Sequence, residues 1–313
     1  MTGQAVDLPG QIFEGLHLRF SPVKSSGICM FAVGPTSVSA QFAADVSYRS
    51  GFRAMFAPDG RIPGWLADGT DAVIISYSGN TKKLLDVYSE LKEHGCRVHC
   101  ITSGGELASL CRRNGDHLIT LPPNFTTHSA VGIEIGILAG LLESLGAPYM
   151  RNALESALPN VSEYRRSLME NPSLTIRISD RLEDRVPSIY SKIDVVAAAK
   201  RWKLAFDKNV GVPSFYGYLP EFDHNEIVGW ADPNVHANSM EIVVLRIKSG
   251  VPEFEYTVDS MMEVLHENDR RVLEIDFDDD DMTAAELEAM VLADMVSEEL
   301  GRRRRPNRCG RCP

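Results

Sequence analysis

A group of hydroxyl side chains follows an apolar segment in the first third of the chain. The segment 72–75 (Ala-Val-Ile-Ile) leads into Ser-Tyr-Ser-Gly-Asn-Thr at residues 76–81, and a helical pattern begins directly afterwards. Gly79 permits a tight turn that directs several backbone N–H groups at one point, where a helix N-terminus is partly positive. Three hydroxyls can rotate to donate to phosphate oxygens there: those of Ser76, Ser78 and Thr81. The pattern therefore favours a site for a phosphate monoester.

The same residue types have a structural explanation as well. Ser, Asn and Thr are ordinary residues of capping turns, so the spacing alone leaves the phosphate site and the capping turn both open. Ser37 follows an earlier apolar segment and Gly34, and it is a further candidate for phosphate binding. Pro35 in that loop removes one backbone donor.

The first half of the chain alternates short apolar segments with helical patterns. The apolar segments are 28–33, 73–76, 97–102 and 117–121, and the helical patterns are 37–48, 84–94 and 106–114. Such alternation predicts an α/β fold with a parallel sheet covered on both faces, whose ligands bind at the carboxyl ends of the strands. The segment 129–145 is apolar and rich in small residues, which indicates a buried helix or a dimer face.

A second alternation follows a polar helical segment at 153–171. Its expected apolar segments are 188–190, 227–228, 242–245 and 272–275, and its expected helices are 195–206 and 284–300. The last of these helices carries apolar residues at helical spacing. The chain is thus expected to hold two α/β parts of similar design.

Specific motifs in both halves resemble one family. Arg-Trp-Lys at 201–203 precedes Pro213, and His-Asn-Glu-Ile-Val-Gly-Trp occupies 224–230. Together with 76–81 and with Ile-Thr-Ser-Gly-Gly-Glu-Leu at 101–107, these residues resemble the bifunctional phosphoglucose/phosphomannose isomerases, a family of sugar isomerase (SIS) domain proteins. The resemblance implies two SIS-type subdomains, each a parallel sheet flanked by helices in three layers.

The resemblance and the patterns predict a domain organisation. A helical lead-in covers residues 1–24, a first SIS domain 25–150, a connector helix 151–185, a second SIS-like domain with the His-Asn-Glu-Ile motif 186–302, and a basic flexible tail 303–313. The tail carries Cys-Gly-Arg-Cys at 309–312, which is half of a zinc site or a redox pair at most, and a solvated tail is the simpler interpretation.

The resemblance also implies catalytic roles. The family's ring-opening histidine falls on His224, and a histidine exchanges protons near neutral pH. In the family this histidine enters the site of the neighbouring subunit, so a homodimer is expected. The glutamate that serves as general base falls on Lys208, because Pro213 fixes the register. A lysine is protonated near neutral pH unless burial or neighbouring charge favours its neutral form.

Two residues are candidates to replace the missing base. Asp207 directly precedes Lys208, but it leaves an α-helix about 100° away and is a poor substitute unless the helix is shifted. His128 stands where the family has an arginine that stabilises developing negative charge, and it can donate a hydrogen bond or act as the base.

Two functions are therefore expected. One is a sugar-phosphate aldose–ketose isomerase that uses His224 with a relocated base and interconverts fructose 6-phosphate with glucose 6-phosphate or mannose 6-phosphate. The other is a catalytically impaired protein of the same fold that binds a phosphorylated hexose as a sensor or scaffold. A nucleotide-binding dehydrogenase is disfavoured, because no Gly-x-Gly-x-x-Gly follows the first apolar segment.

Composition narrows the partners and the compartment. The 313 residues are 44% hydrophobic and 24% charged with a net charge of −11, which argues against nucleic acid or an anionic membrane as the partner. No apolar segment is long enough to span a bilayer, and the first 20 residues lack a basic, apolar leader, so a cytoplasmic protein is expected. Neither a cofactor nor a metal is called for. Four cysteines are expected to be buried thiols: Cys29, Cys96, Cys100 and Cys111.

Overall fold

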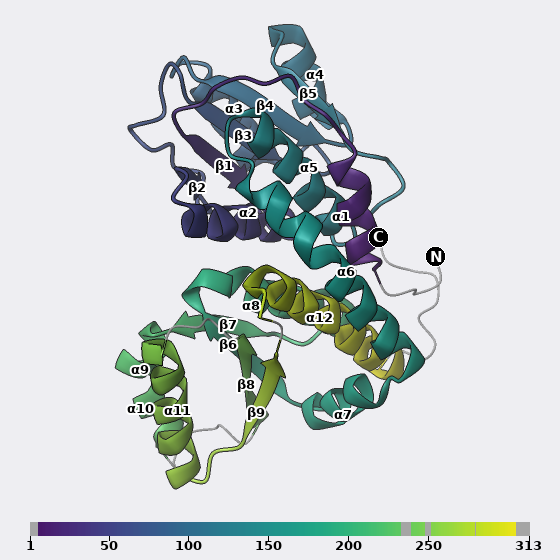
Figure 1. Cartoon of the computed structure of the whole chain (residues 1–313), viewed down its shortest axis with the longest axis vertical. Helices are drawn as coiled ribbons and strands as arrows, with labels where there is room; N and C mark the ends of the chain where they lie inside the picture. The colour runs from purple at the N-terminus through teal and green to yellow at the C-terminus, as the bar shows by residue number, and fades with distance from the viewer. Residues whose placement is uncertain (1–5, 233–238, 248–251, 279, 305–313) are drawn as a thin grey trace. The chain divides into compact units, whose positions relative to one another are not determined.

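The computed structural model describes residues 6–232, 239–247, 252–278 and 280–304. The chain divides into two compact units, one of residues 7–156 and one built mainly from residues 157–313. The long helix α6 (Tyr149–Glu170) contributes to both units (Figure 1). Within the described ranges, no helix has the length and apolar character needed to cross a membrane.

The first unit contains a five-stranded parallel sheet in the order β2-β1-β3-β4-β5. Its strands are β1 (Ile28–Ala32), β2 (Ala54–Phe56), β3 (Asp71–Ile75), β4 (Arg97–Thr102) and β5 (His117–Thr120). Because the strands are parallel, their carboxyl ends lie at one edge of the sheet, and the loops that follow β1, β3, β4 and β5 meet there.

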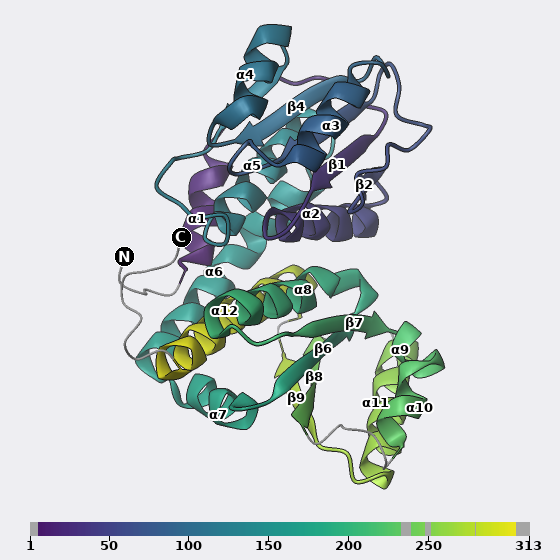
Figure 2. The ribbon, with the colours of Figure 1, turned by 180° about the vertical axis from the view of Figure 1, so that it is seen from behind.

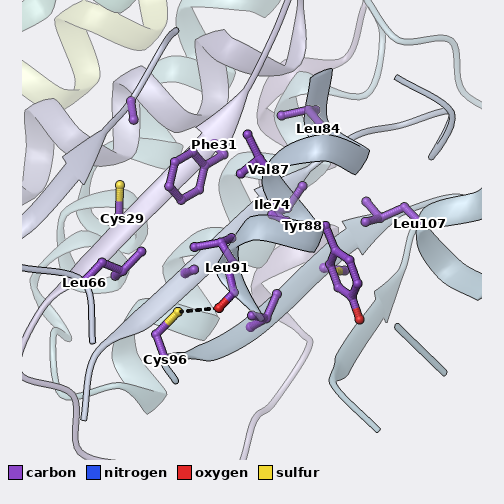
Figure 3. Packing of buried hydrophobic residues seen from close by; sticks show 14 of the residues in the cluster. Cys29, Phe31, Leu66, Ile74, Leu84, Val87, Tyr88, Leu91, Cys96 and Leu107 are labelled. Carbon is purple, nitrogen blue, oxygen red and sulfur yellow. Dashed lines mark hydrogen bonds between the residues drawn. The ribbon is translucent and has the colours of Figure 1, made fainter. Parts of the chain in front are cut away.

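Helices cover both faces of this sheet. They are α1 (Leu8–Leu16), α2 (Thr36–Ser50), α3 (Lys82–Leu91), α4 (Gly105–Asn114) and α5 (Val131–Ser144). Figures 1 and 2 show α3 and α4 on one face and α2 and α5 on the other. The core on the α3 face is close-packed: Phe31 and Ile74 of the strands contact a row of apolar residues on α3 and α4 (Figure 3). The sheet is therefore buried on both faces, as the nearly continuous apolar strands predicted.

Helix α5 is the segment for which a buried helix and a dimer face were both expected. It is buried almost throughout, and α1 of the same chain packs along it. A Cβ atom at Gly132 would lie 2.8 Å from the carbonyl oxygen of Leu8, and Gly136 meets the backbone of Ile12 in the same way. The small residues thus let two helix backbones approach closely, and the structure supports the buried helix.

The second unit contains a four-stranded parallel sheet in the order β7-β6-β8-β9. Its strands are β6 (Val186–Lys192), β7 (Phe215–Leu219), β8 (Met240–Ile247) and β9 (Val272–Phe277). Its helices are α7 (Ser173–Leu182), η1 (Ile193–Val195), α8 (Val196–Ala205), η2 (Phe206–Val210), α9 (Glu221–His224), α10 (Glu226–Ala231), α11 (Pro252–Glu267) and α12 (Met282–Arg304). Helices α8 and α12 cover one face of the sheet, and α9 to α11 cover the other (Figures 1 and 2).

The structure confirms the predicted fold class, with two parallel sheets each flanked by helices. One expected strand is wrong: Ile227 and Val228 lie in helix α10. The fourth strand of the second sheet is instead β7, an edge strand with exposed aromatic side chains, which the search for apolar segments did not detect. The short edge strand β2 was missed as well. Residues 305–313, which include the Cys-Gly-Arg-Cys sequence, lie outside the described part of the chain.

Candidate functional site

The predicted phosphate loop connects β3 to α3 at the carboxyl edge of the first sheet. Ser76 is buried at the end of β3, Ser78 is exposed in the turn, and Thr81 is the half-buried N-cap residue of α3. The hydroxyl oxygens of Ser76 and Thr81 are 3.4 Å apart, and the amide of Asn80 donates to Ser78 Oγ at 3.3 Å. The three predicted hydroxyls are therefore gathered around one turn.

The first turn of α3 bears on the choice between a phosphate site and a simple capping turn. Thr81 is the N-cap residue, but its hydroxyl makes no capping hydrogen bond to the helix. Among the described residues, nothing accepts from the backbone N–H groups of Lys82 and Lys83. Free N–H groups at a helix N-terminus attract an anion. The geometry thus leaves donors available that a capping side chain would have used.

The turn after β4 holds the phosphate loop from one side. Gly79 has φ of +66°, and a Cβ atom there would lie 2.8 Å from Thr102 Oγ1 and overlap the carbonyl of Gly104. The amide of Leu107 donates to the carbonyl of Gly79 at 2.9 Å, and the amide of Glu106 donates to the side chain of Asn80 at 3.0 Å. The loop conformation therefore depends on a neighbouring turn that approaches closely because both turns carry glycine.

Ser37 lies in the loop between β1 and α2, beside the end of β3. Thr36 Oγ1 is 3.4 Å from the carbonyl oxygen of Ile75, which joins this loop to the phosphate loop. The Ser37 hydroxyl is buried and donates to the carbonyl of Gly34 at 2.5 Å. In this conformation Ser37 has no hydrogen to give to a phosphate, so its predicted contribution requires the hydroxyl to rotate.

Tyr77 lies in the candidate site, and the sequence analysis did not single it out. Its hydroxyl oxygen is 3.0 Å from the carbonyl of Pro122 and 2.7 Å from that of Phe125, and the amide of Phe125 donates to it at 3.0 Å. The side chain thus fixes the loop that follows β5. The one available signal was its position inside the Ser-Tyr-Ser-Gly sequence.

His128 lies in this same loop, half-buried, inside a turn that leads into α5. The turn is closed by two reciprocal bonds: the amide of Thr126 donates to Ser129 Oγ at 2.8 Å, and the amide of Ser129 donates to Thr126 Oγ1 at 3.2 Å. The structure therefore brings the loop of His128 to the same sheet edge as Ser76 and Ser78.

The sequence analysis did not single out Glu134 of α5. This side chain is fully buried and accepts from Ser39 Oγ at 2.8 Å.

His224 belongs to the second unit, at the end of the short helix α9, and it is exposed. Its segment is anchored on both sides. Phe222 is buried and packs edge-on against Tyr190, with ring centroids 4.5 Å apart, and Trp230 is buried at the other end. Burial raises the pKa of the adjacent Asp223. His224 is thus an exposed imidazole on a firmly attached support.

The Tyr190 hydroxyl is the centre of that support. It donates to a carboxylate oxygen of Glu226 at 2.5 Å, and it is 3.0 Å from Ser188 Oγ and 3.2 Å from Trp230 Nε1. A buried hydroxyl with three partners is costly to remove, because each partner would lose a hydrogen bond. Tyr190 therefore fixes α10, and with it the Glu226 of the His-Asn-Glu-Ile sequence.

Asp207 and Lys208 lie in η2, which is a π-helical turn. The amide of Gly211 donates to the carbonyl of Phe206 at 3.0 Å, five residues earlier, so this turn is π-helical and not the α-helix that was expected. Asp207 forms an ion pair with Lys203 and accepts from the amide of Ser214 at 3.0 Å. Lys208 is exposed.

The predicted residues thus form two groups. Four hydroxyls and His128 gather at the carboxyl edge of the first sheet. In the second unit, Asp207 and Lys208 follow α8 on one face of the sheet, whereas His224 lies with α9 on the opposite face. The structure therefore does not bring His224 together with Lys208 inside that unit. Within the described residues, no group of three or more His, Cys, Asp or Glu side chains is arranged to hold a metal.

Comparisons with known proteins agree with this architecture. Residues 172–305 match the family model described as the bacterial phospho-glucose isomerase C-terminal SIS domain. The chain is 28% identical over 225 residues, 71% of its length, to 67% of a bifunctional phosphoglucose/phosphomannose isomerase of Aquifex aeolicus. It is 31% identical over 160 residues, half of each chain, to a D-glucosamine-6-phosphate 4-epimerase of Sulfolobus acidocaldarius.

A solved structure matches over nearly the whole chain. The C-terminal domain of glucosamine-fructose-6-phosphate aminotransferase from Francisella tularensis has a TM-score of 0.71, with 95% of this chain and 94% of that chain covered and 14% identity. The chain therefore shares the fold of that domain, and its residues 172–305 match an SIS-domain model. By its motifs, by the family model over residues 172–305 and by the matched relatives, the chain is similar to the bifunctional phosphoglucose/phosphomannose isomerases. It spans between about half and two thirds of the length of the curated relatives.

Proposed function

We propose that this protein is a sugar-phosphate aldose–ketose isomerase of the phosphoglucose/phosphomannose type, which interconverts fructose 6-phosphate with glucose 6-phosphate or mannose 6-phosphate. The observation that carries the proposal is the phosphate loop: three hydroxyls and the unused N–H groups of Lys82 and Lys83 converge at the end of β3. Neutral donors suit a phosphate monoester that must bind and leave.

The reaction needs a group for ring opening and a base. His224 exchanges a proton with the ring oxygen. The base then removes the proton from the carbon next to the carbonyl, the resulting enediolate is stabilised, and the proton returns to the neighbouring carbon, so that no atom is gained or lost. Asp207 and His128 are the proposed bases. Asp207 lies next to the position of the family's base, in a π-helical turn.

The proposed assembly is a homodimer. His224 and Asp207 lie on opposite faces of the second sheet, so one copy of this unit cannot direct both at the same sugar. A second copy that supplies His224 would complete the site, as the family resemblance implies. Domain limits of 25–150 and 186–302, with a connector at 151–185, are part of the same proposal.

We also propose a cytoplasmic location. The four described cysteines are buried free thiols, and structural disulfides are a feature of oxidising compartments.

The second candidate function is binding without turnover. Lys208 is exposed at the position of the family's base, and Asp207 is already engaged by Lys203 and Ser214. A general base contributes about 10²–10⁴-fold in rate, so its loss leaves a protein that binds but hardly reacts. Phosphate binding uses other residues and is unaffected.

A coupled assay with fructose 6-phosphate separates the two functions. Formation of glucose 6-phosphate and of mannose 6-phosphate is followed for the purified protein, with glucosamine 6-phosphate as a further substrate because one relative acts on it. We expect turnover that His224→Gln lowers at least about 100-fold. The control is His266→Gln, an exposed histidine of α11 in the same unit. Turnover in Lys208→Glu but none in the natural protein would establish the binding function.

The phosphate loop is tested by calorimetry. Ser78→Ala with Thr81→Ala removes two hydroxyls, each worth about 1.5–3 kcal/mol when it bonds a charged group. Affinity for fructose 6-phosphate should fall by roughly 100-fold or more. Ser89→Ala, an exposed serine on α3, is the control. Unchanged affinity in the double variant would reject the phosphate loop as the binding site.

A further inference from the structure

A second polar cluster lies at the amino ends of the strands of the first sheet, the edge opposite the phosphate loop. Asp71 opens β3, Arg97 opens β4, and His117 opens β5. In the strand register Asp71 is level with Arg97, and His99 is level with His117. The register therefore brings four ionisable side chains together that are far apart in the sequence.

The four side chains form one connected chain of hydrogen bonds. Arg97 binds Asp71 through two nitrogens, Nε at 2.9 Å and Nη2 at 2.6 Å. His99 Nε2 lies 2.7 Å from Asp71 Oδ1, and His99 Nδ1 lies 2.8 Å from His117 Nδ1. Asp71 is fully buried and His99 nearly so, whereas His117 is exposed. The chain thus runs from a buried carboxylate to an accessible imidazole.

The partners determine where the protons lie. Burial acts to raise the pKa of Asp71, but hydrogen bonds from His99 and Arg97 hold it below its usual range, so Asp71 is a carboxylate. His99 must then donate from Nε2. When the histidine pair is neutral, His99 Nδ1 accepts from His117 Nδ1–H, and His117 Nε2 is left as a proton acceptor. When the pair carries one more proton, His117 Nε2 becomes a donor.

A cavity of about 450 Å³ opens beside this chain, and His99, Arg97 and His117 line it. That volume suits a small organic ligand. Much of the remaining lining is apolar: Phe20, Val23, Val98, Leu141 and Leu145. Phe20 also packs edge-on against the ring of His117, with centroids 5.7 Å apart. The cavity therefore combines an apolar body with one polar wall.

The polar wall has unused donors. Arg97 donates to Asp71 from both Nε and Nη2, and Nη2 also donates to the carbonyl of Lys24. Its Nη1 has no partner among the described residues. The carboxylate of Asp116, which also lines the cavity, is occupied by Lys92 at 2.7 Å and by the Tyr88 hydroxyl. The Cys96 thiol and the Ser25 hydroxyl lie near Asp71, at the buried end of the hydrogen-bond chain. The negative charges of the carboxylates near the wall are thus balanced by the positive charges of Arg97 and Lys92 until the histidine pair gains a proton.

We propose that this cavity is a second ligand site, separate from the phosphate loop, for a small organic carboxylate with an apolar body that binds together with one proton taken up by the His99–His117 pair. The carboxylate accepts from Arg97 Nη1 and from the newly protonated His117 Nε2, and the apolar part contacts Phe20 and Leu141. The added proton gives the wall a net positive charge, which the carboxylate neutralises.

Proton uptake follows from the resting state of the pair. Burial lowers the pKa of His117, and a positive charge on His99 would lower it further, so His117 favours its neutral form at pH 7.5. A bound carboxylate favours the protonated pair. Above the pKa of the free pair, affinity for the carboxylate should fall about tenfold for each pH unit.

The test is calorimetry of the full chain with benzoate at pH 7.5, in buffers of different ionisation enthalpy. We expect benzoate to bind with uptake of about one proton, and benzamide, which has no charge, to bind at least about tenfold more weakly without uptake. His117→Asn should weaken benzoate binding at least tenfold and abolish the uptake, whereas His94→Asn should do neither.

The same measurement separates this site from the phosphate loop. Ser78→Ala with Thr81→Ala should leave benzoate binding unchanged, and benzoate should not compete with fructose 6-phosphate. Inorganic phosphate, which has no apolar part, should not displace benzoate. Absence of benzoate binding, binding without proton uptake, or full affinity in His117→Asn would each overturn the proposal.

Discussion

Replacing Gly79 by alanine tests the idea that two glycine turns shape the phosphate loop. Gly79 has a positive φ of +66°, which a residue with a side chain adopts at a cost of about 1–2 kcal/mol. In addition, its Cβ atom would overlap the carbonyl of Gly104 in the turn after β4. That turn is backbone, so it cannot rotate away and must shift.

The size of the effect follows from the bonds that a shift breaks. The amide of Leu107 donates to Gly79, and the amide of Glu106 donates to Asn80. Each is worth about 0.5–1.5 kcal/mol. With the backbone strain, Gly79→Ala should lower the free energy of unfolding by roughly 2–5 kcal/mol. Displacement of Ser78 and Thr81 should weaken sugar-phosphate binding by about 100-fold or more.

Gly95→Ala is the matched control. Gly95 has nearly the same backbone angle, φ of +73°, but a Cβ atom there meets nothing within 4 Å. The control therefore carries the strain without the overlap, and it should cost about 1–2 kcal/mol and leave binding unchanged. Denaturant unfolding measures the stability of both variants, and calorimetry with fructose 6-phosphate measures their affinity.

The comparison of the two variants decides the matter. Equal free energies of unfolding would mean that the turn after β4 yields easily and does not hold the phosphate loop. Natural affinity in a folded Gly79→Ala protein would mean that the loop conformation is not required for binding. Either result would refute the reasoning given for the role of Gly104.

Three further predictions concern residues outside the hydroxyl cluster. Tyr190→Phe leaves Glu226 and two other groups without their shared partner, so denaturant unfolding should show a loss of about 1–3 kcal/mol; natural stability would contradict the role of this hydroxyl. Tyr77→Phe should speed amide hydrogen exchange at Phe125, and unchanged exchange would show that the loop after β5 is held otherwise. Burial and the charge of Asp294 raise the pKa of Glu298 to about 7, so the folded state holds this proton more tightly than the unfolded state does. Between pH 4.5 and 7 the natural protein should lose on the order of 2 kcal/mol relative to Glu298→Gln in unfolding titrations, and parallel pH curves would contradict this.

The fold was predictable where hydrophobicity alone sets the structure. Strands such as β1 and β3 are buried on both faces and read as continuous apolar segments, and the residues between them have helical spacing. Strand β7 escaped detection because it lies at a sheet edge, where Phe215 and Tyr218 are exposed and no burial pattern develops. The same reasoning misplaced Ile227 and Val228, since two apolar neighbours fit a strand and a short helix equally well.

The candidate site was predictable only in its local part. The hydroxyls proposed to bind phosphate are close in sequence, so their spacing predicts that they lie around one turn. Tyr77 holds a loop about 45 residues away, and Gly104 shapes the phosphate loop from another strand, so neither contact has a local signal. The π turn at Asp207 was not predicted either, because π turns are rare and occur mostly as single turns within α-helices.

The groups proposed for phosphate binding and for proton transfer lie in different parts of this chain, and that separation has a consequence for the proposed function. The proposed donors for phosphate belong to one loop of the first unit, whereas the position of the family's base belongs to η2 of the second. A substitution such as Lys208 for glutamate therefore changes the rate of proton transfer without disturbing the phosphate site. Natural affinity combined with low turnover, restored by Lys208→Glu, is the outcome that this arrangement predicts for a chain that has lost its base.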